Sequence, residues 1–352
     1  MRAVVIGGGV MGCASALELA SRGVRDVVVL ERSVPGAEAS SAAGGILGAQ
    51  VEARNPRELD AFVAAREMHE AWASELRELT GIDVGFRRCG ILTIARNDEE
   101  LAALGREVAA QRERGIEAAT LTGERGAREI EPEVGACRGA AWFARDGQVD
   151  PPRLLRALVA ACADAGVTIR AGTTVSRVVM RGERCAGVEL DGQEELEADV
   201  TVLAAGSWSS LVPGVPSPVP RVRPVRGQMV ELDQRPPRLR RIVFGGHTYV
   251  VPRGDGRVVA GSTMEEVGHR REVTAGGVSD ILGGALANVP SLRAAELVRT
   301  WCNFRPCPEG DVELVGPSGV AGLVLATGHH RNGILLARAT ALAVADAALA
   351  AT

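Results

Sequence analysis

The chain begins with a short apolar run that is followed at once by glycines. Residues 3–6 have no polar side chain, and the sequence of residues 7–12 is Gly-Gly-Gly-Val-Met-Gly. Small and apolar residues dominate residues 13–22, Gly23 follows, and a second apolar run covers residues 27–30. Short apolar runs bounded by glycine are typical of buried parallel strands, and glycine commonly follows the end of a helix. The pattern predicts a strand, a glycine turn, a helix and a second strand.

Three further stretches have the spacing of helices. Residues 57–79 and 98–114 are polar and rich in oppositely charged pairs four positions apart, which stabilise an exposed helix. We expect these two helices in a cap or substrate region. Asp150 precedes two prolines and begins a third helix, expected to run to Ala165, because proline is favoured at the first helical position.

The remaining apolar pattern predicts strands. Residues 167–175 and 187–190 are expected to form strands around a tight turn, and residues 199–205 a buried strand. Residues 216–299 alternate with a period of two and contain hairpin signals, which predicts an antiparallel sheet. Residues 322–327 form a last apolar strand before a glycine turn and a long alanine-rich helix.

The first glycine turn has the G-x-G-x-x-G pattern of dinucleotide-binding proteins. Gly7 permits the tight turn, Gly9 lets the backbone approach a pyrophosphate, and Gly12 lets helix and strand pack closely. The helix N-terminus then offers N–H groups and a positive dipole end to the phosphates. Glu31 ends the second strand, where an acid accepts hydrogen bonds from a ribose and disfavours a 2′-phosphate. The motif therefore predicts NAD or FAD, and does not decide between them.

Two other segments fit an extended cofactor. Residues 38–48 are small, with hydroxyls and glycines that could lie along a ribityl chain, although an ordinary loop has the same composition. Residues 328–333 form a turn in which Asn332 and Gly333 open the last helix. Its positive dipole end would stabilise negative charge on a reduced flavin, or it is an ordinary capped turn.

Charge and composition exclude several classes of protein. The chain has 352 residues, 24% of them charged, and a formal net charge of −4, which is typical of a globular protein of two domains. It has no basic block, so we expect no nucleic-acid partner. All 40 basic residues counted as Lys or Arg are arginines, which excludes a Schiff-base or P-loop lysine.

Cysteine usage and hydropathy indicate the compartment. The seven cysteines are odd in number and form no C-x-x-C pair, so a reducing environment is expected rather than a disulfide framework. No apolar run of about 18 residues is free of charge, since Arg338 and Asp346 interrupt residues 334–351, so we expect no membrane span. The strand at residue 3 leaves no room for a signal peptide, and a cytoplasmic protein is expected.

Seven motifs in order along the chain resemble one family. Besides the N-terminal unit, these motifs are residues 39–45, 202–208, 224–228, 247–253, 261–268, 301–306 and 328–337. Together they resemble the FAD-dependent D-amino-acid oxidase superfamily, and within it most closely the glycine oxidases of thiamine biosynthesis. The resemblance covers nearly the whole chain.

The resemblance implies an α/β plus α+β fold. An FAD-binding Rossmann-type domain of the glutathione-reductase-like kind would be joined to an antiparallel-sheet substrate domain. We expect the FAD-binding domain to be discontinuous and to comprise residues 1–48, 145–215 and 300–352. Residues 49–144 and 216–299 would form the substrate or cap domain.

The resemblance also implies FAD as a non-covalent cofactor and assigns residues to it. The expected cofactor-binding residues are Gly7, Gly9, Val10, Met11, Gly12, Glu31, Arg32, Ala39, Ser40, Gly44, Gly45, Ile46, Val175, Ala205, Gly206, His329, Arg331, Asn332, Gly333, Ile334 and Leu335. No metal site is expected, because the adjacent His329 and His330 have no partner at metal-ligand spacing.

Four residues are expected to orient the substrate. Arg305 matches the family's carboxylate-binding arginine, although Asn303 and Phe304 replace the residues that usually precede it. Arg331 is a second candidate that could contact both substrate and flavin. Tyr249 is the only tyrosine, and His247 precedes it by two residues on the expected strand. From the residues alone, a surface arginine and a core tyrosine remain open readings.

The implied reaction is oxidative deamination of glycine, sarcosine or a small D-amino acid. Hydride would pass from Cα to flavin N5, oxygen would be reduced to hydrogen peroxide, and water would hydrolyse the imine to a 2-oxo acid and ammonia. No general base is required if the amine binds unprotonated. The alternatives are a dehydrogenase that passes electrons to a quinone or partner subunit, and a non-catalytic flavin-binding subunit. A homo-oligomer is expected.

Two segments depart from the family pattern. Cys302 resembles in its spacing the cysteine that holds flavin covalently in monomeric sarcosine oxidase, so a thioether is an alternative to a small apolar strand residue. Asp311 and Glu313 stand where the family has a different sequence, which would place acids near the flavin edge.

Overall fold

The first apolar run forms the centre of a six-stranded sheet. The computed structural model describes residues 1–216, 219–310 and 313–351. The strands of this sheet, in spatial order, are β18 (Leu314–Pro317), β19 (Leu323–Thr327), β12 (Val200–Leu203), β1 (Arg2–Ile6), β2 (Asp26–Glu31) and β8 (Thr168–Ala171). All neighbours pair in parallel except β18, which is antiparallel to β19. The sequence order of the strands requires crossovers, as in dinucleotide-binding folds.

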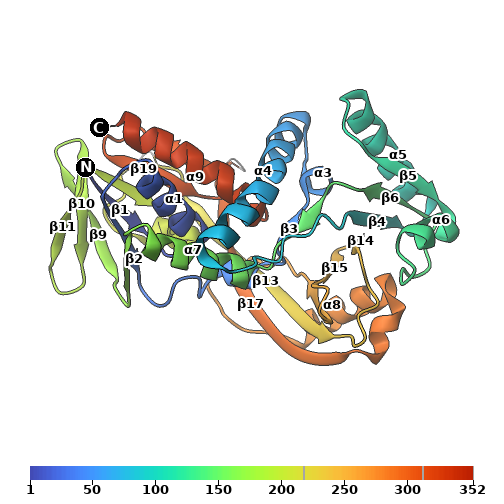
Figure 1. The fold of residues 1–352 in the computed structure, drawn as a ribbon. Coiled ribbons are helices and arrows are strands. Elements are labelled where there is room, and N and C mark those ends of the chain that lie inside the picture. The colour runs from blue at the N-terminus through green and yellow to red at the C-terminus, as the bar shows by residue number, and fades with distance from the viewer. Residues whose placement is uncertain (217–218, 311–312, 352) are drawn as a thin grey trace.

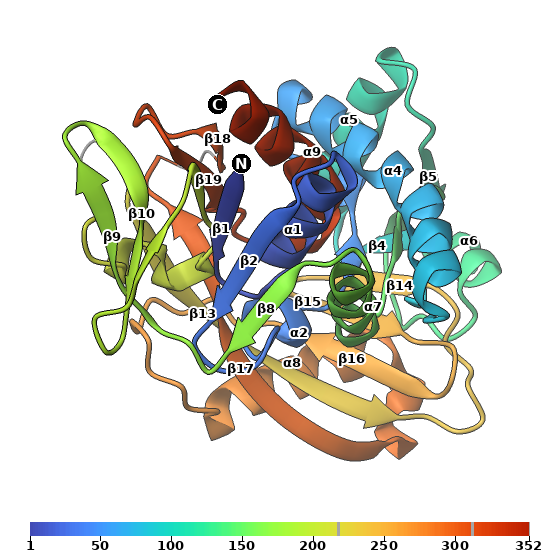
Figure 2. The same ribbon diagram turned by 60° about the vertical axis from the view of Figure 1, so that its left-hand side comes forward.

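Alternate residues of the central strands face two different layers. Ala3 and Val5 pack in a core with helices, whereas Val4 and Ile6 pack with a small three-stranded sheet. The helices are α1 (Val10–Ser21), α4 (Pro56–Thr80), α7 (Pro151–Asp164) and α9 (Gly333–Ala350). The small sheet consists of β9 (Val175–Arg181), β10 (Arg184–Leu190) and β11 (Glu195–Glu197). Figure 2 shows β9 and β10 of the small sheet on one side of β1 and helix α1 on the other.

The predicted helices are present with small changes in their ends. The helix predicted at 57–79 is α4, and the one at 98–114 is α5 (Asp98–Glu113). The Asp150 side chain accepts from the backbone N–H of Arg153 and caps α7, as its place before two prolines predicts.

The strands predicted at residues 167–175 and 187–190 are present, but the prediction that they flank one tight turn is wrong. The first of these segments supplies β8, which pairs with β2 in the six-stranded sheet. The hairpin is instead formed by β9 and β10, with Gly182 in its turn. Both arrangements have apolar β pattern on each side of a glycine, so the pattern alone did not distinguish them.

Helix α9 passes a length and composition test for a membrane span, but half of it is buried inside the fold. It packs against α1 and α4, and Figure 1 shows it lying along the β1–β19 side of the protein. Arg338 of α9 donates to Glu18 of α1 at 2.7 Å. These contacts are those of a core helix.

The second sheet has eight strands and is mixed rather than antiparallel. Its strands, in spatial order, are β17 (Glu296–Pro308), β13 (Val222–Asp233), β16 (Arg257–Gly261), β15 (Thr248–Pro252), β14 (Ile242–Gly245), β4 (Ile91–Ala95), β6 (Gly139–Phe143) and β5 (Ala119–Thr122). The pairing of β14 with β4 is parallel, which corrects the expectation of an all-antiparallel sheet. Figure 1 shows β13 and β17 running side by side from the cofactor-sheet side of the protein toward α8.

The uniform strand pattern predicted for residues 216–299 is also wrong in one part. Residues Ala275–Asn288 form helix α8, which Thr274 caps by accepting from the N–H of Gly277. Val230, Val250 and Ala260 pack toward α8. The opposite face of the sheet carries Met229 and Tyr249 and packs with Ile46, so it faces the cofactor side.

Several short elements complete the chain. They are α2 (Ala39–Ala42), β3 (Ile46–Leu47), α3 (Ala49–Glu52), α6 (Gly123–Ile130), β7 (Gly147–Gln148) and the 3-10 helices η1 (Gly206–Leu211) and η2 (Pro290–Ala294). β3 and β7 pair with each other and lie between the two large sheets.

Candidate active site

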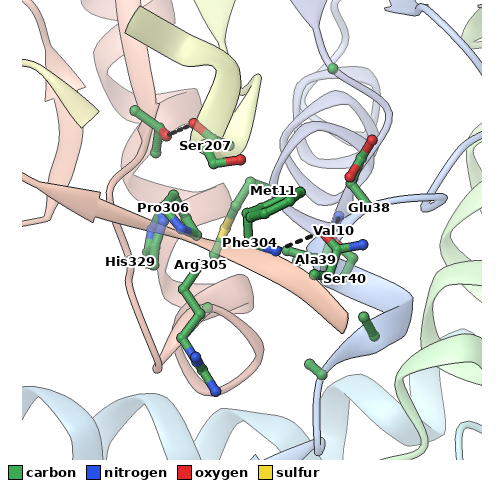
Figure 3. A pocket seen from close by; sticks show the side chains of 18 of the residues that line it. Val10, Met11, Glu38, Ala39, Ser40, Ser207, Phe304, Arg305, Pro306 and His329 are labelled. Atoms are coloured by element: carbon green, nitrogen blue, oxygen red, sulfur yellow. Dashed lines mark hydrogen bonds between the residues drawn. The ribbon is translucent and has the colours of Figure 1, made fainter. Parts of the chain in front are cut away.

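A long pocket runs from the carboxyl end of β1 to the second sheet. Most of the residues expected at the cofactor or substrate line it (Figure 3). These lining residues are Gly7, Gly9, Val10, Met11, Glu31, Arg32, Ala39, Ser40, Gly44, Gly45, Ile46, Val175, Ala205, Gly206, Tyr249, Arg305, His329, Arg331, Asn332, Gly333 and Ile334. Segments far apart in the chain therefore meet around one cavity.

Three expected residues do not line the pocket. Gly12 lies under the glycine turn, where an added Cβ would come within 1.9 Å of the Gly7 carbonyl oxygen, which is the close packing predicted for it. Leu335 is buried, and its carbonyl contacts His69 Nε2 at 2.9 Å. His247 is exposed in the turn before β15, because the strand begins one residue later and the expected alternation with Tyr249 does not apply.

The departures from the family pattern differ in where they lie, since Asn303 and Phe304 line the pocket and the others do not. Cys302 is buried in β17 opposite Gln228 and is not a lining residue, so nothing in the described part of the chain supports a thioether. Glu313 is half-buried and does not line the pocket, and Asp311 lies outside the described residues.

The N-terminus of α1 forms a cradle for a diphosphate. Gly7 has φ +108°, a value that L side chains rarely adopt, and no side chain caps α1 at Gly9. The N–H of Val10 donates to Ser40 Oγ at 2.9 Å, which fixes the loop of small residues over the helix end. An added Cβ at Gly9 would lie 3.1 Å from the same oxygen. The N–H groups of α1 beyond Val10 and the positive dipole end of the helix suit the phosphates of FAD.

Glu31 occupies the position expected of a ribose-binding acid. Its carboxylate accepts from the backbone N–H of Gly8 at 2.8 Å and of Ser33 at 2.9 Å. These two donors orient the side chain at the pocket wall, and a carboxylate has further lone pairs for hydroxyl groups. The Glu31 carboxylate and the cradle at the α1 N-terminus together fit an adenine dinucleotide.

A second helix end faces the pocket from the other side. α9 begins at Gly333, and the side chain of Asn332 makes no capping hydrogen bond. His329 is fully buried, with Nε2 2.8 Å from Thr340 Oγ1. Burial lowers the pKa of His329 to about 3, so the ring is neutral at physiological pH and adds no charge to this helix end.

Arg305 reaches into the substrate end of the pocket, apart from the cradle residues Val10 and Ser40 (Figure 3). It donates to the Ser262 hydroxyl at 2.6 Å and to the Thr263 carbonyl at 3.1 Å. Burial lowers the pKa of Arg305. An added Cβ at Gly227 would lie 2.4 Å from its guanidinium, so the glycine makes room for the side chain. The remaining N–H groups can bind a carboxylate in a fork.

Tyr249 lines the pocket together with Arg305 and packs closely against two glycines. Its hydroxyl donates to Met229 Sδ at 3.3 Å, a weak acceptor that a ligand oxygen could replace. An added Cβ at Gly44 would lie 3.2 Å from the Tyr249 ring and hydroxyl, and one at Gly261 would lie 3.0 Å from the hydroxyl. Both glycines therefore make room for the Tyr249 side chain.

Some lining residues were not singled out from the sequence. Gly227 and Ser262 fell inside family motifs without being assigned a role, whereas Glu52 lies beyond the loop of residues 38–48. Glu52 was missed because one acid at the end of a short helix has no distinguishing spacing. Its contact with Arg331 joins residues that are distant in sequence.

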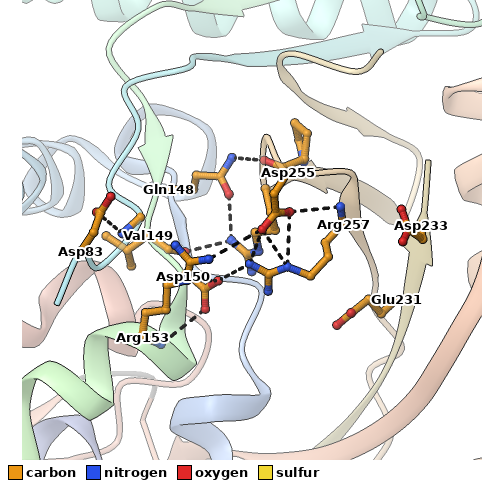
Figure 4. A network of polar contacts seen from close by, with 12 residues as sticks. Asp83, Gln148, Val149, Asp150, Arg153, Glu231, Asp233, Asp255 and Arg257 are labelled. Carbon is orange, nitrogen blue, oxygen red and sulfur yellow. Dashed lines mark hydrogen bonds and ion pairs between the residues drawn. The ribbon is translucent and has the colours of Figure 1, made fainter. Parts of the chain in front are cut away.

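A buried arginine ties the cofactor loop to the second sheet. Arg253 donates to Gln148 Oε1 at 2.7 Å, to the Val149 carbonyl at 2.8 Å and to the Gly44 carbonyl at 2.9 Å. Burial lowers the pKa of Arg253 to about 10. Figure 4 shows the neighbouring part of this network, where Asp150 at the start of α7 meets Arg257 at 2.9 Å.

Replacing Arg253 with methionine is expected to destabilise the fold by about 2–4 kcal/mol, because three buried acceptors lose their donor. The affinity for FAD should fall too, since Gly44 lines the pocket. Thermal unfolding and titration with FAD would measure both effects. Arg181→Met is the matched control, because the ion pairs of Arg181 with Glu195 and Glu197 are exposed to solvent and contribute little to stability. Equal behaviour of the two variants would contradict the role of Arg253.

Comparison with known proteins identifies relatives that span the chain. The model of the family described as FAD dependent oxidoreductase matches residues 2–347. A glycine oxidase of Geobacillus kaustophilus is 36% identical over 97% of the chain and 91% of its own length. A crystal structure of a glycine oxidase from that organism has a TM-score of 0.93 at 35% identity, covering 99% of the chain and 94% of its own.

Other relatives are longer. A bifunctional protein ThiO/ThiG of Trichormus variabilis is 34% identical over 97% of the chain, but the match covers 52% of that protein. The chain thus spans about half the length of the first curated relatives that it matches.

Proposed function

Since the chain belongs to the family of FAD dependent oxidoreductases, we propose that it oxidises a small amino acid at its amine-bearing carbon. The observation that carries this proposal is Arg305, which lies at one end of a pocket whose other end is a dinucleotide cradle. A cationic fork at the end of the pocket opposite the cradle suits a carboxylate held against a flavin ring.

The residues of the chain have distinct tasks in this reaction. Bound FAD supplies a two-electron acceptor. Arg305 binds the substrate carboxylate, and the Tyr249 hydroxyl exchanges Met229 for a carboxylate oxygen. The α9 N-terminus, beside neutral His329, offers a positive dipole end where negative charge develops. The chain orients the reactants and needs no general base if the amine binds unprotonated.

The substrate proposed is glycine, sarcosine or a small D-amino acid. The names of the glycine oxidase relatives support a small amino acid. We further propose that oxygen is the electron acceptor and yields hydrogen peroxide, and that the imine is hydrolysed to a 2-oxo acid and ammonia.

We also propose that the chain is divided into two domains. Residues 1–48, 145–215 and 300–352 would form the FAD-binding domain, and residues 49–144 and 216–299 the substrate domain. The six-stranded sheet supports this division, since all of its strands fall in the first set of ranges. Two elements depart from it: most of β17 lies beyond residue 300 but belongs to the eight-stranded sheet, and α4 packs with the helices of the cofactor sheet. A cytoplasmic homo-oligomer is proposed as the working form, with no nucleic-acid partner.

Anaerobic titration of the holoprotein tests the function. Glycine, sarcosine, D-alanine and D-proline are added in turn, and the flavin absorbance is followed. Bleaching by at least one amino acid is expected, and the order of affinities ranks the substrates. No bleaching by any of the four would favour a non-catalytic flavin-binding subunit.

The electron acceptor is tested in air. Peroxide formed in proportion to substrate consumed is expected for an oxidase. Bleaching without peroxide, together with rapid reduction of a quinone analogue, would favour the dehydrogenase reading.

A further inference from the structure

The substrate end of the pocket contains a second arginine whose charge is already paired. Arg331 precedes α9 and donates to Glu52 Oε1, at the end of α3, at 2.7 Å. Both residues line the pocket together with Arg305. The Glu52 side chain is 16% exposed and the Arg331 side chain is 36% exposed, so solvent reaches this ion pair mainly from the side of the arginine.

Arg305 differs from Arg331 in its partners. Its two hydrogen bonds go to a hydroxyl and a carbonyl, which carry no net charge. Among the residues that the structure describes, no carboxylate lies within 4.0 Å of its guanidinium nitrogens. The two arginines and Glu52 therefore leave one uncompensated positive charge at the substrate end, which matches a ligand with one carboxylate.

Resting on the function proposed above, we propose that Glu52 is a specificity-determining residue that restricts the site to amino acids with one anionic group. A second carboxylate on the substrate would meet the Glu52 charge, or would have to displace Glu52 from Arg331. Either event weakens binding, because like charges approach each other or an existing ion pair must be broken. Without the Glu52 charge, the Arg331 guanidinium would be able to bind the second carboxylate through two parallel hydrogen bonds.

Matched substrate pairs test this inference in the holoenzyme. Sarcosine and iminodiacetate differ by a carboxylate on the N-substituent, and D-alanine and D-aspartate differ by one on the side chain. For Glu52→Gln, we expect kcat/KM for at least one dicarboxylate to rise about 10-fold or more relative to its monocarboxylate partner. Binding of malonate relative to acetate, followed by the flavin absorption spectrum, should shift in the same direction.

Two further variants separate specificity from structure. In Glu52→Gln/Arg331→Met the relative gain should disappear, because the freed guanidinium is gone. Glu194→Gln breaks an exposed pair with Arg170 outside the pocket and should leave every ratio unchanged.

The inference is overturned if Glu52→Gln oxidises the monocarboxylates with no change in any ratio, since the ion pair would then only anchor α3. It is also overturned if the double variant keeps the gain. A wild-type protein that oxidises none of the amino acids would instead overturn the proposed function. The two failures are therefore distinguishable.

Discussion

Replacing Arg305 with alanine is expected to lower kcat/KM by about 100-fold or more while FAD remains bound. The guanidinium is the uncompensated cation at the substrate end, and its hydrogen bonds to Ser262 and Thr263 hold it in a single position. Its loss removes both the charge and the geometry that place Cα near the acceptor. Steady-state kinetics with the best amino acid, together with the flavin spectrum of the variant, measures the effect.

Two comparison variants sharpen this prediction. Arg305→Lys keeps the charge but not the planar fork, so it should recover only part of the lost activity. Arg299→Ala lies on the same strand, where the side chain is 60% exposed and pairs with Glu231, and it should behave nearly as wild type. Unchanged kinetics in Arg305→Ala would remove Arg305 from the substrate site.

Replacing Gly12 with alanine is expected to abolish FAD binding and to destabilise the fold by at least about 2 kcal/mol. The added Cβ would lie 1.9 Å from the carbonyl oxygen of Gly7, and a backbone atom cannot move aside as a side chain can. Helix α1 must then shift away from β1, which opens the cradle that its N-terminus forms. Retained flavin per chain and the unfolding temperature are the measurements.

Gly105→Ala is the matched control for this prediction. Gly105 lies inside helix α5, and no atom lies within 4 Å of its added Cβ. Alanine is favoured over glycine in a helix, so this variant should be unchanged or more stable by about 0.5–1 kcal/mol. A Gly12→Ala protein that retains flavin and stability like Gly105→Ala would contradict the packing argument.

The cofactor half was predictable because its signals are local. A buried strand, a glycine turn and a helix follow one another within the first residues, and Glu31 ends the next strand. Each of these features has a steric or electrostatic cause that one short segment contains. The arrangement of Gly12 beneath Gly7 follows the same reasoning, and the glycine geometry confirms it.

The substrate half was less predictable because its order depends on distant pairings. The glycine-rich segment of α8 lacks a clear helical pattern, and its burial comes from strands that it covers. No local sequence pattern predicts that β4 pairs in parallel with β14. Likewise, His247 falls outside the pocket because β15 begins one residue after it, and Glu52 acquires its role only through contact with Arg331.

The most direct test of the account is the flavin content of the purified wild-type chain. The protein, or the apoprotein after addition of FAD, should show the absorption spectrum of a bound flavin at about one FAD per chain. Acid denaturation should release the flavin into the supernatant, since no cysteine lines the pocket in the described part of the chain. A folded protein that stays colourless and takes up no FAD would contradict the central claim.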